Sequence, residues 1–386
     1  MTKLKSGWRV VKFDEIAQNV AVRVDPADAK TDIYVGLEHL DPSTIHLRQW
    51  GHPSDVTGQK LAFKKGDVIF GRRRAYQRKL AVAEFDGICS AHAMVVRAKP
   101  KMILPEFLPF FLQSDMFMER AIEISVGSLS PTINWKTLKV QEFPLPPLDE
   151  QKRIAEILWV ADEALEKWTE AYRQSESALS STRSQILQEL SQTEECVFLK
   201  DVGRWVSGGT PSRSRSDFWN GDFPWVSPKD MKKDVISDSE EKLTDTALNG
   251  RVTILPSESI LIVVRGMILA HTFPVAVTGR EVTFNQDMKG IIPNSDFSAE
   301  YVFHWFKDNS ARILQATEES THGTKRLATD VLYGMQIPKP SSAKQEMVVT
   351  VFETFRTKLV EISEHIAASQ QMLRSLRNAK VGAAHV

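Results

Sequence analysis

The sequence has 386 residues, enough for two or three domains, and its 42% hydrophobic and 25% charged residues are typical of a globular protein. Its longest apolar runs are far shorter than the roughly 20 residues that a membrane span needs, and two cysteines are too few for a secreted disulfide scaffold, so a cytoplasmic protein is expected. Lysine plus arginine and aspartate plus glutamate both number 49, which excludes a nonspecific DNA binder that relies on a strongly basic chain.

The first globular part is expected to cover residues 1–148. The β-branched run at 68–70 predicts a buried strand, and 106–113 has the pattern of an amphipathic helix. A basic cluster follows that strand and predicts a DNA-contacting loop, because arginine can grip phosphate or guanine and glutamine suits adenine. A solvated basic loop is the alternative. The candidate side chains are Arg72, Arg73, Arg74, Gln77, Arg78 and Lys79.

A long helix is predicted at 149–191, since the segment lacks proline and glycine. Its apolar positions alternate in steps of four and three, the pattern of a coiled-coil seam. The seam consists of Ile154, Leu158, Ala161, Leu165, Trp168, Tyr172 and Leu179.

The next part, expected at 192–341, repeats the first at an offset of about 194 residues. The segment 143–147 returns at 337–340, whereas 34–36 matches 225–227 at an offset of about 191. The run at 260–264 predicts the strand equivalent to 68–70, and amphipathic spacing predicts a helix at 300–307. A solvated surface is the alternative reading for its cationic candidates, which are Arg213, Arg215, Lys229, Arg265, Lys325 and Arg326. The last two belong to a polar loop at 320–326 that matches one at 125–130.

A second long helix is predicted at 342–382, with Ser342 and Gln345 at the spacing of a capping box. Its seam keeps the register of the first helix and consists of Val348, Phe352, Phe355, Leu359, Ile362, Ile366 and Leu373. An exposed helix with such a seam needs a partner, and the other helix is the nearest candidate. Ordinary core helices of one large domain are the alternative.

We therefore expect an α+β fold: two tandem pseudo-repeat globular domains separated by two long helices that form an antiparallel coiled coil with pseudo-twofold symmetry. Two similar but non-identical heads at a fixed separation suit a bipartite, asymmetric DNA site.

The segment at 144–158, PLPPLDEQKRIAEIL, resembles the start of the central helical region in type I restriction–modification specificity subunits. GDVIFGRRR at 66–74 and the pair Asn285 and Gln286 also resemble their target-recognition domains. The order head, helix, head, helix extends the resemblance over nearly the whole chain, although the second helix start, PKPSSAKQEMVVTVF, lacks the acidic residue and the Arg-Ile pair of the first.

The resemblance implies that each head is a target-recognition domain and that the helices are spacers that dock two methyltransferase subunits. Further restriction subunits act as motors, and S-adenosylmethionine, ATP and magnesium are expected on those partners, with no cofactor, metal or catalytic residue in this chain.

Two other functions stay open at this stage. A DNA-modifying enzyme with divergent motifs would bind S-adenosylmethionine or a divalent metal by itself, although no Walker A, HExxH or GxSxG motif is present. A protein-interaction scaffold without specific DNA binding would fit the zero net charge and the long helices.

Overall fold

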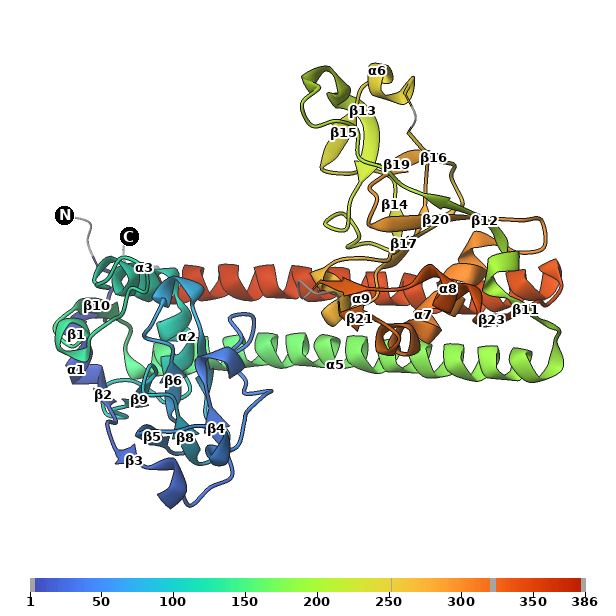
Figure 1. Cartoon of the computed structure of the whole chain (residues 1–386). Helices are drawn as coiled ribbons and strands as arrows, with labels where there is room; N and C mark the ends of the chain where they lie inside the picture. The colour runs from blue at the N-terminus through green and yellow to red at the C-terminus, as the bar shows by residue number, and fades with distance from the viewer. Residues whose placement is uncertain (1–3, 251, 320–323, 383–386) are drawn as a thin grey trace. The chain divides into compact units, whose positions relative to one another are not determined.

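The computed structural model describes residues 4–250, 252–319 and 324–382. These residues divide into two compact units: unit 1 consists of residues 1–170 and 363–386, and unit 2 of residues 171–362. The long helices α5 (Leu148–Thr193) and α9 (Ser342–Val381) each contribute one segment to either unit (Figure 1). No helix in the described ranges combines the length and the hydropathy that crossing a membrane requires.

The globular part of unit 1 contains two four-stranded sheets and a strand pair. The first sheet has the order β2 (Ala17–Asn19), β9 (Met94–Ala98), β6 (Val68–Phe70), β7 (Leu80–Val82), and the second β3 (Arg23–Val24), β5 (Lys60–Phe63), β8 (Gly87–Cys89), β4 (Tyr34–Val35). The pair joins β1 (Arg9–Lys12) to β10 (Glu142–Leu145). The helices are α1 (Phe13–Ile16), α2 (Leu108–Gln113), α3 (Asp115–Glu123) and α4 (Trp135–Leu138).

Unit 2 repeats this plan. Its first sheet has the order β12 (Gly203–Ser207), β20 (Met288–Pro293), β17 (Ile260–Val263), β18 (Val275–Thr278), β14 (Val235–Ile236), and its second β15 (Glu241–Leu243), β13 (Trp219–Val226), β19 (Val282–Phe284), β16 (Ile254–Leu255). Strand pairs join β11 (Cys196–Phe198) to β23 (Gln336–Pro338) and β21 (Glu318–Glu319) to β22 (Lys325–Arg326). The helices are α6 (Asp245–Leu248), α7 (Ala299–Gln315) and α8 (Thr329–Tyr333).

Strand pairing confirms the internal duplication that the sequence predicts. Tyr34 in β4 pairs in parallel with Ile88, and Trp225 in β13 pairs in parallel with Thr283, as the local offset of 191 requires. The runs at 68–70 and 260–264 are the central strands β6 and β17, which are fully buried. The fold is therefore α+β with two pseudo-repeats.

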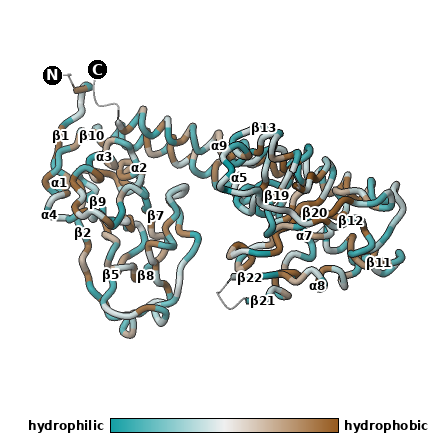
Figure 2. The backbone as a smooth tube through the Cα atoms, turned by 45° about the horizontal axis from the view of Figure 1, so that its top comes forward, coloured by the Kyte–Doolittle hydropathy of each residue, from teal (hydrophilic) through white to brown (hydrophobic). Residues whose placement is uncertain are grey.

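The seam residues of the long helices lie largely in the interior of their own unit. Every predicted seam residue is buried or half-buried except Trp168, which is 37% exposed and stacks on His365 with ring centroids 4.6 Å apart. In unit 2, Lys344 in the first turn of α9 pairs with Glu194 just after α5, so the two segments run antiparallel there. The turns of the helices alternate between hydrophilic and hydrophobic residues in Figure 2. One continuous coiled coil stays a prediction.

Two glutamines at the same register join each long helix to its globular part. Gln151 is 1% exposed; its Oε1 accepts from Leu104 N at 2.9 Å, and its Nε2 donates to the carbonyls of Met102 and Pro146. Gln345 is equally buried and makes the three equivalent bonds, each partner 194 residues further along the chain; these partners are Ser298 N, Asp296 O and Pro340 O.

The predicted capping box at the start of the second helix is therefore wrong. Gln345 turns toward the globular part because three buried backbone groups there need a partner, and Ser342 is already helical. The hydroxyl of Ser341 accepts from Lys344 N instead, at 3.4 Å.

Candidate nucleic-acid interface and domain–helix joints

The basic loop of unit 1 folds against the polar loop at 125–132. Arg73 forms an antiparallel bridge with Thr132, and its Nε donates to Ser130 Oγ at 2.8 Å. Arg74 and Arg78 have φ angles of 56° and 54°, a left-handed conformation that non-glycine residues adopt only where the surrounding structure fixes it. The two loops that the sequence treats separately thus form one surface.

The six candidates in this loop differ in their surroundings. Arg78 forms an ion pair with Asp115, and Lys79 Nζ donates to the carbonyl of Leu37 at 2.9 Å, so both support the fold. Arg73, Arg74 and Gln77 are exposed, as is the neighbouring Tyr76. Arg72 is half-buried and points its Nη2 to the carbonyl of Ala91.

Unit 2 brings three of its candidates together at the equivalent place. Arg265 forms an antiparallel bridge with Arg326, and Gly266 N donates to the carbonyl of Lys325 at 3.0 Å. Lys325 Nζ pairs with Glu319 at 3.0 Å. Residues 320–323 of the predicted polar loop lie outside the described residues. The shared loop position carries an exposed arginine-rich sequence in unit 1 and an arginine followed by Gly266 and the exposed Met267 in unit 2.

The remaining candidates of unit 2 belong to the other sheet. Arg213 lies 3.8 Å over the ring of Trp219 and pairs with Glu241, which lowers the pKa of that carboxyl. Arg215 pairs with Asp217 at 2.6 Å, whereas Lys229 is exposed. The structure therefore does not gather Arg213, Arg215 and Lys229 with the Arg265 group.

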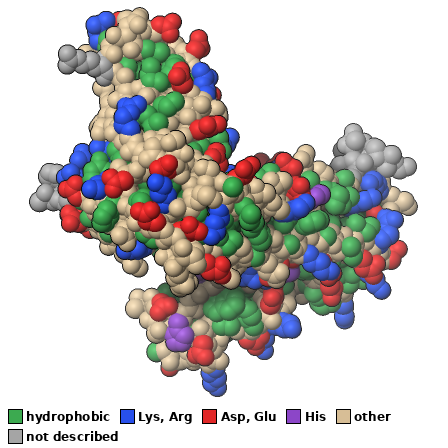
Figure 3. Space-filling model, turned by 90° about the vertical axis from the view of Figure 1, so that its right-hand side faces the viewer, with side chains coloured by type: hydrophobic (Ala, Val, Ile, Leu, Met, Phe, Trp, Pro, Cys, Tyr) green, Lys and Arg blue, Asp and Glu red, His purple; other side chains and the backbone are tan. Residues whose placement is uncertain are grey.

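The pair at 285–286, part of the family resemblance, also has structural partners. Asn285 is buried and its Oδ1 accepts from Asp287 N at 3.0 Å, and Gln286 bonds to Thr210. On the face that Figure 3 presents, lysine and arginine side chains are interspersed with acidic ones.

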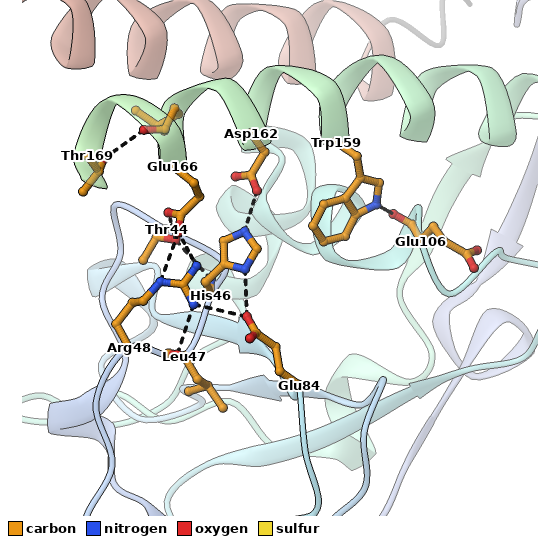
Figure 4. A network of polar contacts seen from close by, with 11 residues as sticks. Thr44, His46, Leu47, Arg48, Glu84, Glu106, Trp159, Asp162, Glu166 and Thr169 are labelled. Carbon is orange, nitrogen blue, oxygen red and sulfur yellow. Dashed lines mark hydrogen bonds and ion pairs between the residues drawn. The ribbon is translucent and has the colours of Figure 1, made fainter. Parts of the chain in front are cut away.

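A network of charged groups joins the globular part of unit 1 to α5 (Figure 4). His46 places its two ring nitrogens against carboxylates: Nε2 lies 2.7 Å from Asp162 on α5, and Nδ1 lies 2.8 Å from Glu84. Arg48 pairs with Glu84 and with Glu166, which is also on α5. The sequence gave no warning of this joint, because its members come from three separate segments.

The imidazole of His46 can donate to both carboxylates only when it is protonated, and the bond to Asp162 is the main cause of its raised pKa. A raised pKa in the folded state contributes stability that is complete below about pH 6.5 and is lost as the pH rises through the folded value. We expect His46→Gln to lower the free energy of unfolding by roughly 1–2 kcal/mol at pH 6 and by less at pH 9.

Urea unfolding of both proteins at the two pH values measures this difference. His52→Gln is the matched control, since His52 is exposed in the same unit. Equal losses for His46→Gln at pH 6 and pH 9 would contradict the assignment of a charged imidazole.

Unit 2 has a different joint at a corresponding position. The ring pair of Phe110 and Trp159 in unit 1, with centroids 5.1 Å apart, is replaced 194 residues later by His304 and Glu353, whose Nε2 and Oε1 lie 3.0 Å apart. His304 is 1% exposed, and burial lowers its pKa. The two units thus share a backbone plan but differ in the chemistry of their joints.

Comparison with known proteins identifies the family. The family described as "Type I restriction modification DNA specificity domain" matches residues 51–171 and 192–369, more than half of the chain and both pseudo-repeats. The chain belongs to this specificity family. The membership confirms the resemblance that the segment at 144–158 suggested.

Relatives of this specificity family agree in sequence and in fold. The specificity subunit of EcoR124I/EcoR124II from Escherichia coli is 34% identical over 184 residues, 47% of this chain and 46% of that protein. The HindI specificity subunit from Haemophilus influenzae is 21% identical over 97% of this chain and 100% of its own length. The matches to the E. coli subunit and to the MjaIX specificity subunit of Methanocaldococcus jannaschii each span less than half of the relative's length.

Solved structures share the specificity-family fold across the whole chain. A chain from the assembled type I restriction–modification system superposes with a TM-score of 0.60 at 19% identity, covering 100% of this chain and 99% of the other. The S subunit from M. genitalium gives a TM-score of 0.55 at 16% identity, with 99% of each chain covered.

Among the described residues, no three His, Cys, Asp or Glu side chains are grouped to hold a metal ion.

Proposed function

We propose that this chain is the sequence-specific DNA-recognition subunit of a type I restriction–modification complex and has no catalytic site of its own. The observation that carries the proposal is the duplicated fold in which the same surface loop has different side chains in the two units: Arg73 and Arg74 in unit 1, but Arg265 and Gly266 in unit 2. Different side chains at one docking position would read different base sequences, which makes the target bipartite and asymmetric.

In this proposal the globular parts of both units contact double-stranded DNA, and α5 and α9 act as a spacer and dock two methyltransferase subunits. Restriction subunits join the same complex. The partners supply the chemistry, binding S-adenosylmethionine, ATP and magnesium, and the complex works in the cytoplasm. The candidates for base contact are the exposed side chains Arg73, Arg74, Gln77, Arg265 and Arg326.

A scaffold without specific DNA binding is the second candidate function. The balanced total charge favours it, and so do the ion pairs that neutralise Arg213 and Arg215.

Gel-shift titration of the chain assembled with its methyltransferase partner separates the two functions. DNA recognition predicts selection of a bipartite duplex from a randomised pool and a binding constant that falls steeply with salt, because phosphate contacts release counterions. A scaffold predicts no selected sequence. Binding of S-adenosylmethionine by the isolated chain, measured by calorimetry, would instead support a modifying enzyme.

A further inference from the structure

Unit 1 contains a cavity of about 290 Å³ whose lining is cationic. It opens beside β2, β3 and β5, and its polar walls are the side chains of Asn19, Arg23, Gln59, Lys60 and Arg72. The residues that line it include three cations and two amides, and none of them is an aspartate or glutamate. The cavity thus gathers hydrogen-bond donors of one charge in a chain whose total charge is zero.

Arg72 has donors to spare at this wall. Its Nη2 donates to the carbonyl of Ala91 at 3.1 Å, which fixes the guanidinium, but its buried Nε has no hydrogen-bond partner. Buried donors are nearly always satisfied, so a donor of this kind marks a place where a ligand completes the bonding.

The other two cations are held by neutral groups. Lys60 Nζ donates to the carbonyls of Thr57 and Gly58, and Arg23 Nη1 lies 3.4 Å from Gln59 Oε1. Carbonyl and amide oxygens orient these side chains without cancelling their charge. By contrast, Arg78, Arg213 and Arg215 each pair with a carboxylate.

The neighbouring imidazole reports the resulting field. The pKa of His92 is lowered, first by burial and then by the positive charges of Arg73, Arg72 and Lys60. An uncompensated positive field, an unsatisfied guanidinium N–H and an acid-free lining together favour an anion with several acceptor oxygens.

We infer that this cavity binds one phosphodiester group of the DNA backbone, with Arg72 and Arg23 as its charged donors. The inference rests on the proposed function and refines it: Arg72 positions the DNA, whereas the exposed Arg73 and Arg74 are left to contact bases. An arginine that neutralises a phosphate carries no sequence information itself but fixes the register in which neighbouring side chains meet the bases.

The contact belongs to unit 1 alone. The carbonyl of Arg72 accepts from Ile133 N, and the equivalent bond in unit 2 runs from Leu327 N to the carbonyl of Val264. Val264 is buried and apolar, so unit 2 has no guanidinium at this backbone position.

The test compares Arg72→Met with the unmodified full chain, each assembled with the methyltransferase partner, on the duplex that the unmodified complex selects. We expect binding roughly tenfold weaker, a salt slope smaller by about one, and the same loss on duplexes with a matched or an altered first half-site. Arg23→Met should act in the same direction, and Arg72→Lys should restore part of the binding. Lys101→Met is the control, because it removes one exposed charge outside the cavity.

A duplex series with a single neutral methylphosphonate linkage identifies the ligand. One position in the series should reproduce the loss, and Arg72→Met should add nothing further on that duplex. Unchanged binding by Arg72→Met, or a loss confined to the matched half-site, would overturn the phosphate assignment while leaving the proposed function intact. Failure of the unmodified complex to select any duplex would overturn the proposed function and this inference with it.

Discussion

Exchange of residues 192–341 for the corresponding domain of a relative with another target is expected to replace one half of the recognised sequence and leave the other half unchanged. The expectation follows from the way unit 2 is built. Its buried residues form their own clusters, which include α7 and the central strands β17 and β20. The change in specificity should therefore be complete at one half-site and absent at the other.

The ends of the exchanged segment are well placed for this experiment. They pair with each other, since Cys196 in β11 faces Pro338 in β23, so the grafted part enters and leaves at one point. Gln345 lies outside the segment and reaches backbone groups of the exchanged part, Ser298 N and Asp296 O, which any donor sequence can offer at those positions.

Selection from a randomised duplex pool, before and after the exchange, measures the outcome. The matched control exchanges residues 1–148, which should alter the opposite half-site only. A change in both halves after either exchange would show that the two domains do not read DNA independently.

Substitution of Gln151 by leucine should cost unit 1 roughly 3 kcal/mol in free energy of unfolding. Leucine is of similar size but cannot bond, so the N–H of Leu104 and the carbonyls of Met102 and Pro146 would lose their partner. Each buried polar group left unsatisfied costs about 1–3 kcal/mol. Gln345→Leu should have a similar effect on unit 2.

Chemical denaturation followed by circular dichroism measures the loss. Gln371→Leu is the control, because Gln371 is exposed on the segment of α9 that belongs to unit 1. A loss below about 1 kcal/mol for Gln151→Leu would mean that the three backbone groups find other partners in the variant.

Periodicity and repetition made much of this fold predictable. The seam of the long helices, the two buried central strands and the change of offset from 194 to 191 residues all follow from spacing along the chain. The break between α2 and α3 was harder to foresee, because it depends on Ser114, whose hydroxyl caps α3 by accepting from Phe117 N. In unit 2 the equivalent helix α7 continues without a break.

The candidate site was predictable only in part. Sequence composition located the arginine-rich loop, but it could not show that Arg78 and Lys79 have structural partners while Arg73 and Arg74 face solvent. Charge neutralisation depends on residues distant in the chain, as Asp115 is from Arg78. The cavity at Arg72 brings together residues from 19 to 94, a proximity that local patterns do not encode.

The contrast between His46 and His304 gives two sibling domains opposite responses to acid. Protonation strengthens the contact of His46 with Asp162, whereas His304 must give up a lowered pKa and a buried site before it can take a proton. As the pH falls, the first domain should gain grip on its helix while the second loses it, so mild acidification would loosen one reading head of the pair before its twin.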